Sequence, residues 1–234
     1  MKRFLYLLIL FIFVKSNAQT KGIFSKDPII NLENWDKQRL SFGYFLGFNT
    51  FDYKIDYLTT PQTDIIVKAN TGFSVGLISN FRLQEYLYLR FEPGLYYTQR
   101  NLTYSGFTKS IDREREIRST YIDFPILLKF SSKRTGNVRP YLVGGVSTTL
   151  NLASNARSID DNYQQRFRVK TWTQNYQLGF GIDLFLEYFK FSPSIRGVFG
   201  LNDELIRDNN PNSPWTGNIS SLKSRGVLIN FTFQ

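Results

Sequence analysis

The stretch NYQLGFGIDLFL, residues 175–186, decides the fold of this chain because two kinds of side chain alternate along it. One set is apolar and comprises Tyr176, Leu178, Phe180, Ile182, Leu184 and Leu186. The other set is small or polar and comprises Asn175, Gln177, Gly179, Gly181 and Asp183. Successive side chains of a β-strand point to opposite faces, so this period of two predicts a strand with one apolar face.

The same alternation recurs in seven other segments, which span residues 40–49, 71–81, 87–95, 121–130, 139–150, 191–201 and 226–233. We therefore predict an all-β fold, an eight-stranded antiparallel β-barrel over residues 39–234. Pro93, Pro125 and Pro193 lie inside three of these segments. A closed barrel has no free edge where a missing N–H is harmless, so we expect β-bulges at these prolines.

The connections between the predicted strands alternate in length. The long ones span residues 52–70, 98–119, 153–172 and 202–221, and the short ones span residues 83–86, 131–138 and 187–190. Bacterial outer-membrane barrels place short turns in the periplasm and long loops outside the cell. The pattern predicts a transmembrane barrel of a Gram-negative outer membrane, preceded by a periplasmic segment over residues 19–38.

The first 18 residues predict export. Lys2 and Arg3 precede an apolar run over residues 4–14, and the small residues that a signal peptidase reads follow at Ser16 and Ala18. A membrane anchor is the alternative, but a run of eleven residues is shorter than the roughly 20 that span a bilayer as a helix. We expect residues 1–18 to be a signal peptide that is cleaved before Gln19.

Composition favours a membrane barrel over a soluble one. A secreted sandwich or a lipocalin-like cup would turn the apolar faces inward, whereas a membrane barrel turns them to lipid. Aromatic residues make up 17% of the chain, and they lie opposite a narrow face of Gly and Ser. With no cysteine, the chain offers neither disulfides nor a site for lipidation. The large aromatic face and the signal peptide together favour the membrane.

The charge of the chain indicates its partners. Loss of the signal peptide removes Lys2, Arg3 and Lys15 and lowers the net charge from +10 to +7. The remaining positive residues are scattered among the loops, and export takes the chain away from most nucleic acids. We expect no nucleic-acid partner, and we expect contacts with outer-membrane lipid and lipopolysaccharide, which supply anionic head groups.

The last predicted strand resembles the C-terminal signal by which outer-membrane barrels are handed to the barrel insertion machinery. The residues that carry this resemblance are Gly226, Ile229, Phe231 and Phe233. The final residue, Gln234, departs from the commonest ending, which is aromatic.

The chain has no histidine, and this absence excludes more functions than any motif supports. Barrel hydrolases and acyltransferases rely on a histidine base, which cannot be assembled here. Serine–lysine chemistry has no spacing that singles out a pair. Asp160 with Asp161 and Asp203 with Glu204 are candidates for an all-oxygen calcium site, and solvated loop carboxylates are the alternative. We expect no enzyme, no catalytic or metal site and no cofactor.

Six charged residues fall on the small or polar faces of the predicted strands. They are Arg90, Glu92, Asp123, Lys129, Asp183 and Arg196. An Arg or Lys that faces lipid near the bilayer midplane costs about 2 to 4 kcal/mol, so we expect these charges to form a network inside the lumen. A narrow eight-stranded lumen favours a structural plug of ion pairs, and a proton or solute path is the alternative.

Four stretches have sequence patterns that are more specific than the alternation common to all membrane barrels. They are residues 31–37 (NLENWDK) with the glycines and aromatic residues of 42–55, residues 121–130 (YIDFPILLKF), residues 179–184 (GFGIDL) and residues 191–196 (FSPSIR). Together they resemble the PorT family of Bacteroidetes outer-membrane barrels, and the N-terminal stretch is the more specific part. The resemblance implies an accessory component of the type IX secretion system, which exports folded cargo and supports gliding motility. It also implies other secretion-system proteins as partners and supplies no catalytic residues.

Two regions are candidates for contact with partners. In the polar segment 19–38, Trp35 and Asp36 are the candidate docking residues, and a disordered tail is the alternative. The long loops contain residue types of protein interfaces, as at Tyr104, Arg113, Tyr163 and Trp215. A surface-interaction or adhesion barrel that acts through these loops is therefore the second functional hypothesis.

Overall fold

The computed structural model describes residues 29–61 and 63–234, so the predicted signal peptide and its cleavage site lie outside the described residues. The strands are β1 (Leu40–Tyr57), β2 (Ile66–Ala69), β3 (Thr71–Arg82), β4 (Leu87–Phe91), β5 (Gly94–Thr103), β6 (Glu114–Ser131), β7 (Val138–Asn151), β8 (Trp172–Phe185), β9 (Lys190–Gly200) and β10 (Ile219–Phe233). A short helical turn, η1 (Glu33–Lys37), precedes β1, and two more, α2 (Ser110–Arg113) and η2 (Asn162–Gln164), lie in the long loops. In the part of the chain described, no helix is long and apolar enough to cross a membrane.

The predicted antiparallel barrel is confirmed, with ten strands in place of eight. β4 and β5 are two halves of the strand predicted over residues 87–95, since both pair with β3 on one side and with β6 on the other. β2 pairs only with β5 and extends the wall within the first long loop. Eight strand positions therefore still surround the lumen, and the count differs because one strand is interrupted and one loop adds a strand.

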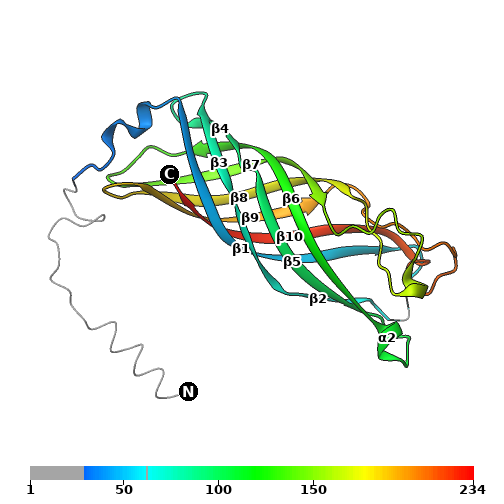
Figure 1. Cartoon of the computed structure of the whole chain (residues 1–234). Helices are drawn as coiled ribbons and strands as arrows, with labels where there is room; N and C mark the ends of the chain where they lie inside the picture. The colour runs from blue at the N-terminus through cyan, green and yellow to red at the C-terminus, as the bar shows by residue number, and fades with distance from the viewer. Residues whose placement is uncertain (1–28, 62) are drawn as a thin grey trace, which may run out of the picture.

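Pairing of β1 with both β3 and β10 closes the sheet into a barrel (Figure 1). The first described residues, the C-terminus and the short turns lie at one end of this barrel, and α2 and the long loops lie at the other. Because bacterial outer-membrane barrels keep their short turns in the periplasm, we take the end with the C-terminus as periplasmic.

The apolar faces of the strands point outward and the small or polar faces point into the lumen. In β8, Leu178 is 64% exposed, whereas Gln177 and Asp183 on the opposite face are buried. A band of exposed apolar side chains around a closed barrel is the surface that lipid covers. The alternation of the sequence is therefore that of a membrane barrel, and a soluble barrel with an apolar interior is excluded.

Several large aromatic residues lie on the lumen face, and Phe45 shows how they are accommodated. Phe45 of β1 is fully buried, and its ring fills the lumen beside Gly76 and Gly94 of the neighbouring strands. A Cβ at Gly76 or Gly94 would lie 2.5 Å or 2.6 Å from the ring. These glycines are therefore part of the lumen packing, since a larger residue at either position would displace the ring.

The prediction of β-bulges at the prolines is wrong. Pro125 and Pro193 are paired with Ser147 and Phe231 without a register shift. Pro93 separates β4 from β5, yet both halves keep the same register against β6. A residue of an antiparallel strand directs its N–H to one neighbour only, so each proline removes one hydrogen bond and leaves the pairing on its other side intact.

The long loops are shorter than predicted because the strands continue into them. β1 runs to Tyr57, β5 runs to Thr103, and β10 already begins at Ile219. In β5 every second side chain continues to point into the lumen beyond the predicted end of the strand, since Arg100 and Leu102 are both buried. The wall of the barrel therefore rises on the loop side beyond the segments that alternate most sharply in sequence.

The outward face gives a direct test of the membrane assignment. We expect Leu178→Arg in β8 to lower the free energy of unfolding by about 2 to 4 kcal/mol in lipid vesicles, because this arginine would face hydrocarbon. Leu58→Arg is the matched control, since Leu58 is equally exposed, at 65%, but lies in a loop at the opposite end from the C-terminus. Urea unfolding followed by tryptophan fluorescence measures both, and equal losses would contradict the assignment.

Candidate functional site: the charged lumen and its periplasmic mouth

All six charged residues predicted for the lumen are buried inside the barrel. The first cluster forms around Glu92, whose Oε1 lies 2.9 Å from Arg90 Nη1 and whose Oε2 lies 2.6 Å from Arg196 Nη2. Arg90 also donates through Nε to Asn80 Oδ1 at 2.6 Å. One carboxylate thus bridges two guanidinium groups on different strands.

The second cluster forms around Asp183, which is fully buried. Its carboxylate accepts hydrogen bonds from Lys129 Nζ at 2.7 Å, from Ser192 Oγ at 2.7 Å and from Arg139 Nη2 at 3.1 Å. The ring of Tyr141 joins the two clusters, because its centroid lies 3.8 Å from Lys129 Nζ and 5.3 Å from Cζ of the Arg90 of the first cluster. Two cations and a hydroxyl satisfy this carboxylate as a buried charge requires.

Asp123 belongs to neither cluster. Its carboxylate accepts hydrogen bonds from Thr149 Oγ1 at 2.5 Å and from Gln177 Nε2 at 2.7 Å, and no ion pair to it is found among the described residues. A cavity beside it is lined partly by Asn175 and leaves about 20 Å³ for the centre of a water molecule. That space holds about one water, so the lumen is nearly filled at this level.

Sequence reasoning missed several buried cations, among them Arg100, Arg139 and Lys190. The period of two could have found all three, since Arg100 continues the phase of Glu92, Arg139 has the phase of Tyr141 and Lys190 has the phase of Arg196. Arg100 was passed over because it lies in a predicted loop, beyond the end of the strand predicted over residues 87–95. Arg139 begins a predicted strand whose alternation is weak, and Lys190 closes a predicted short turn.

An apolar cluster closes the loop end of the lumen. Its members are Tyr53, Leu102, Tyr104, Ile117, Phe167, Val169, Leu205, Trp215, Ile219 and Leu222. Next to the cluster, the guanidinium of Arg100 lies 3.9 Å from the ring centroid of Tyr53 and donates to Ser224 Oγ at 3.1 Å. Glu204 of the last loop accepts from the same Ser224, and burial raises the pKa of Glu204 above its usual value. The loop end is therefore closed by apolar packing.

The acidic loop residues considered for calcium hold the loop backbone. Asp161 accepts hydrogen bonds from the N–H groups of Tyr163 and Asn209, each at 3.0 Å. Asp203 accepts one from the N–H of Leu222 at 2.9 Å. Within residues 29–61 and 63–234, no three His, Cys, Asp or Glu side chains are grouped to hold a metal ion.

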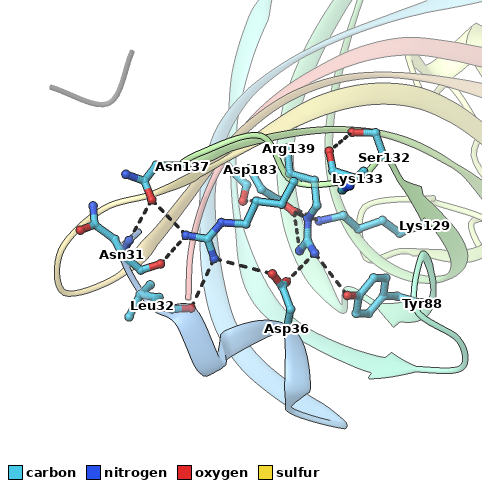
Figure 2. A network of polar contacts seen from close by, with 12 residues as sticks. Asn31, Leu32, Asp36, Tyr88, Lys129, Ser132, Lys133, Asn137, Arg139 and Asp183 are labelled. Carbon is cyan, nitrogen blue, oxygen red and sulfur yellow. Dashed lines mark hydrogen bonds and ion pairs between the residues drawn. The ribbon is translucent and has the colours of Figure 1, made fainter. Parts of the chain in front are cut away.

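The segment over residues 29–38 covers the periplasmic mouth of the barrel (Figure 2). Asp36 Oδ1 lies 2.5 Å from Nη1 of Arg139, whose Nη2 contacts Asp183 from the other side. Asp36 Oδ2 lies 3.6 Å from Arg134, and Lys190 Nζ lies 5.0 Å from the ring centroid of Trp35. The barrel itself therefore holds this part of the chain, which is no free tail, and docking of an outside partner on Trp35 and Asp36 stays a prediction.

The residues of the predicted insertion signal lie at the seam where β10 meets β1. Ile229, Phe231 and Phe233 alternate toward the outer face, and the ring of Phe233 stacks on Tyr44 of β1 at a centroid distance of 5.3 Å. Gly226 lies on the lumen face, where a Cβ would come within 2.7 Å of the Phe51 ring. Recognition by the insertion machinery stays a prediction.

A closed antiparallel barrel with an apolar outside and a charged inside defines a transmembrane β-barrel of the outer membrane. The family model described as "Outer membrane protein beta-barrel domain" matches residues 17–205 of this chain. The chain therefore belongs to the outer membrane protein beta-barrel domain family, and its place is the outer membrane.

Several solved barrels have a similar fold at low sequence identity. OprG from Pseudomonas aeruginosa is 14% identical, with a TM-score of 0.47, and the match covers 82% of this chain and 92% of that one. Neisserial surface protein A is 10% identical, with a TM-score of 0.44 and coverages of 83% and 98%. AlkL is 12% identical, with a TM-score of 0.42 and coverages of 92% and 97%. No curated protein matches the chain.

The first cluster gives a test of the structural plug. We expect Glu92→Gln to lower the free energy of unfolding by about 3 to 5 kcal/mol, because Arg90 and Arg196 would both lose their buried carboxylate. Asp123→Asn should cost less, since neutral groups hold that carboxylate. Glu116→Gln is the matched control, because the pair of Glu116 with Arg118 is exposed and contributes at most about 1 kcal/mol.

The midpoint of heat-induced gel-shift unfolding ranks the three variants. If Glu92→Gln is as stable as wild type but the protein loses its function in cells, the structural plug is contradicted and a proton or solute path is favoured.

Proposed function

We propose that this barrel is a non-enzymatic accessory component of the type IX protein secretion and gliding machinery in the outer membrane of a Bacteroidetes bacterium. The observation that carries the proposal concerns residues 31–37, the more specific part of the resemblance to the PorT family. In the structure these residues cover the periplasmic mouth, with Asp36 paired to Arg139 and Arg134. The stretch is therefore positioned where periplasmic parts of a secretion machine are within reach.

The filled lumen supports an accessory role over transport. Charged clusters occupy the periplasmic half of the lumen, and the apolar cluster occupies the loop end. An eight-stranded barrel is too narrow for folded cargo in any case. What such a barrel offers to a machine is its two ends, as attachment surfaces held rigidly in the membrane.

The absence of enzymatic activity is part of the proposal. The sequence has no histidine, and Lys129, a candidate base for serine–lysine chemistry, has its Nζ 2.7 Å from both oxygens of Asp183. This contact engages the lysine with the buried carboxylate, which is a structural role and leaves no free base. The proposed partners are outer-membrane lipid and lipopolysaccharide, the insertion machinery and other secretion-system proteins.

The alternative is a surface-interaction or adhesion barrel, and one observation favours it. Trp215 stacks on Phe107 at a centroid distance of 4.9 Å and meets Tyr163 edge-on at 5.0 Å, which makes the loop end rigid and aromatic. Of the loop residues named from sequence, Tyr104 and Trp215 are buried, and Tyr163 and Arg113 remain exposed to a partner.

Deletion of the gene in its own bacterium separates the two functions. We expect the deletion strain to retain cargo inside the cell and to lose gliding, and we expect the wild-type gene to restore both. A gene carrying Trp35→Ala and Asp36→Ala should yield an assembled, heat-modifiable barrel that fails to restore secretion. Normal secretion with loss of adhesion alone would contradict the secretion role and support the loop function.

Capture of the barrel from detergent-solubilised outer membrane, followed by mass spectrometry, identifies what is bound. We expect secretion-system proteins to be recovered with the wild-type barrel and to be depleted with the Trp35→Ala, Asp36→Ala variant, because a complete partner protein would dock on these two side chains themselves. Glu116→Gln serves as the control, because Glu116 lies on the exposed face of β6, away from the mouth.

A further inference from the structure

The periplasmic mouth contains more positive than negative charge. Its cations are Lys129, Arg134, Arg139 and Lys190, and its carboxylates are Asp183 of β8 and Asp36 of the covering segment. Asp183 is shared by Lys129 and Arg139, and Asp36 is shared by Arg139 and Arg134. No ion pair reaches Lys190 within the described residues. Four cations therefore face two ion-paired carboxylates among these described residues.

Lys190 is the residue that shows this imbalance most clearly. It is 2% exposed, its Nζ lies over the ring of Trp35, and the nearby Asp183, which Lys129 and Arg139 already share, makes no ion pair with it. A cation over an aromatic ring recovers only part of the solvation that burial removes. Gln234 is paired directly opposite Lys190 through both backbone hydrogen bonds, and its side-chain Nε2 and Oε1 are buried without a partner. Within the described residues, an ammonium without an ion pair and an amide without a hydrogen-bond partner thus lie next to each other on the lumen face.

The covering segment contacts the mouth through the groups that a peptide ligand has. Its Asp36 carboxylate meets two guanidinium groups, and the backbone carbonyls of Asn31 and Leu32 accept from Arg134. The backbone N–H of Asn31 donates to Asn137 Oδ1 at 2.9 Å, and Asn137 Nδ2 donates to the carbonyl of Ile29 at 2.7 Å. This pattern requires an N–H donor beside a carboxylate, which a peptide has and a phosphate head group lacks.

The segment is held in a way that permits exchange. None of the residues of η1 is buried, so the contacts are ion pairs and hydrogen bonds at the rim of the mouth rather than packed apolar groups. The Asp36 side chain is 33% exposed, so water and salt reach its ion pairs with Arg139 and Arg134 from the side of the segment. A competing segment with a carboxylate for Arg139 and a second one for Lys190 would satisfy one more cation than the chain's own segment does.

We infer that the periplasmic mouth is a binding site for an acidic, aromatic peptide segment of a partner protein, and that residues 29–38 are its intramolecular occupant. The partner segment places one carboxylate against Arg139 and Arg134 and an aromatic ring or a second carboxylate against Lys190. Its binding releases Trp35 and Asp36 from the barrel. The inference concerns the isolated barrel, so it is tested separately from the secretion role.

The experiment uses a fluorescein-labelled peptide with the sequence of residues 29–38, IINLENWDKQ, and the mature chain folded in detergent. In one form of the chain the mouth is vacated by Trp35→Ala and Asp36→Asn. We expect the vacated barrel to bind the peptide at least about tenfold more tightly than wild type, since the wild-type segment competes for the same site. Asp36→Asn in the peptide should weaken binding to the vacated barrel by about tenfold, the effect expected for loss of a charged hydrogen-bonded pair.

Lys190→Met in the vacated barrel should also weaken binding, whereas Lys54→Met, at an exposed lysine near the opposite end of β1, should leave it unchanged. Heat-modifiable migration shows which variants are folded, and the comparison of the two peptides on one vacated barrel needs no further barrel variant. Equal affinity of wild-type and vacated barrels, or equal affinity of the Asp and Asn peptides, overturns the inference. Binding of phosphatidylglycerol vesicles without binding of the peptide overturns it in favour of an anionic lipid.

Discussion

The hydrogen bonding between β1 and β10 is the constraint on which the rest of this structure depends. Hydrocarbon offers no partner to a free N–H or C=O, so a sheet in a membrane has to pair its first strand with its last. The two strands close the barrel in the register that places Tyr44 of β1 opposite Phe233 of β10. Once the ring is closed, each side chain faces either lipid or a narrow lumen, and the period of two in the sequence follows from this choice.

Closure also determines what the charged residues do. A charge on a wall strand cannot face hydrocarbon, so it enters a lumen that is narrow enough to bring charges from different strands into contact. Glu92 meets two arginines there, and Asp183 meets a lysine, an arginine and a serine. The two ends differ, because apolar side chains fill the loop end and a surplus of cations remains at the periplasmic end.

Much of the fold was predictable because the signal is local. Alternation within residues 175–186 gives the two faces of a strand, and the same alternation in seven other segments gives the number of wall positions. The prediction weakened at and beyond strand ends, where Arg139 and the predicted loop residue Arg100 were left out of the lumen although both have the phase of lumen residues. It was wrong on β-bulges, because Pro125 loses a single hydrogen bond and keeps its register.

The sequence by itself determined the strands, their two faces, the export signal as an expectation and the six charged residues that a closed barrel has to take inside. Only the tertiary structure decided which charges meet, since Glu92 and Arg196 come from strands far apart in the chain. It also decided that Asp36 lies on Arg139, 103 residues away, and that Lys190 is buried without an ion pair among the described residues. Strand phase is set by neighbours along the chain, whereas ion pairs are set by register and closure between strands, which no local pattern contains.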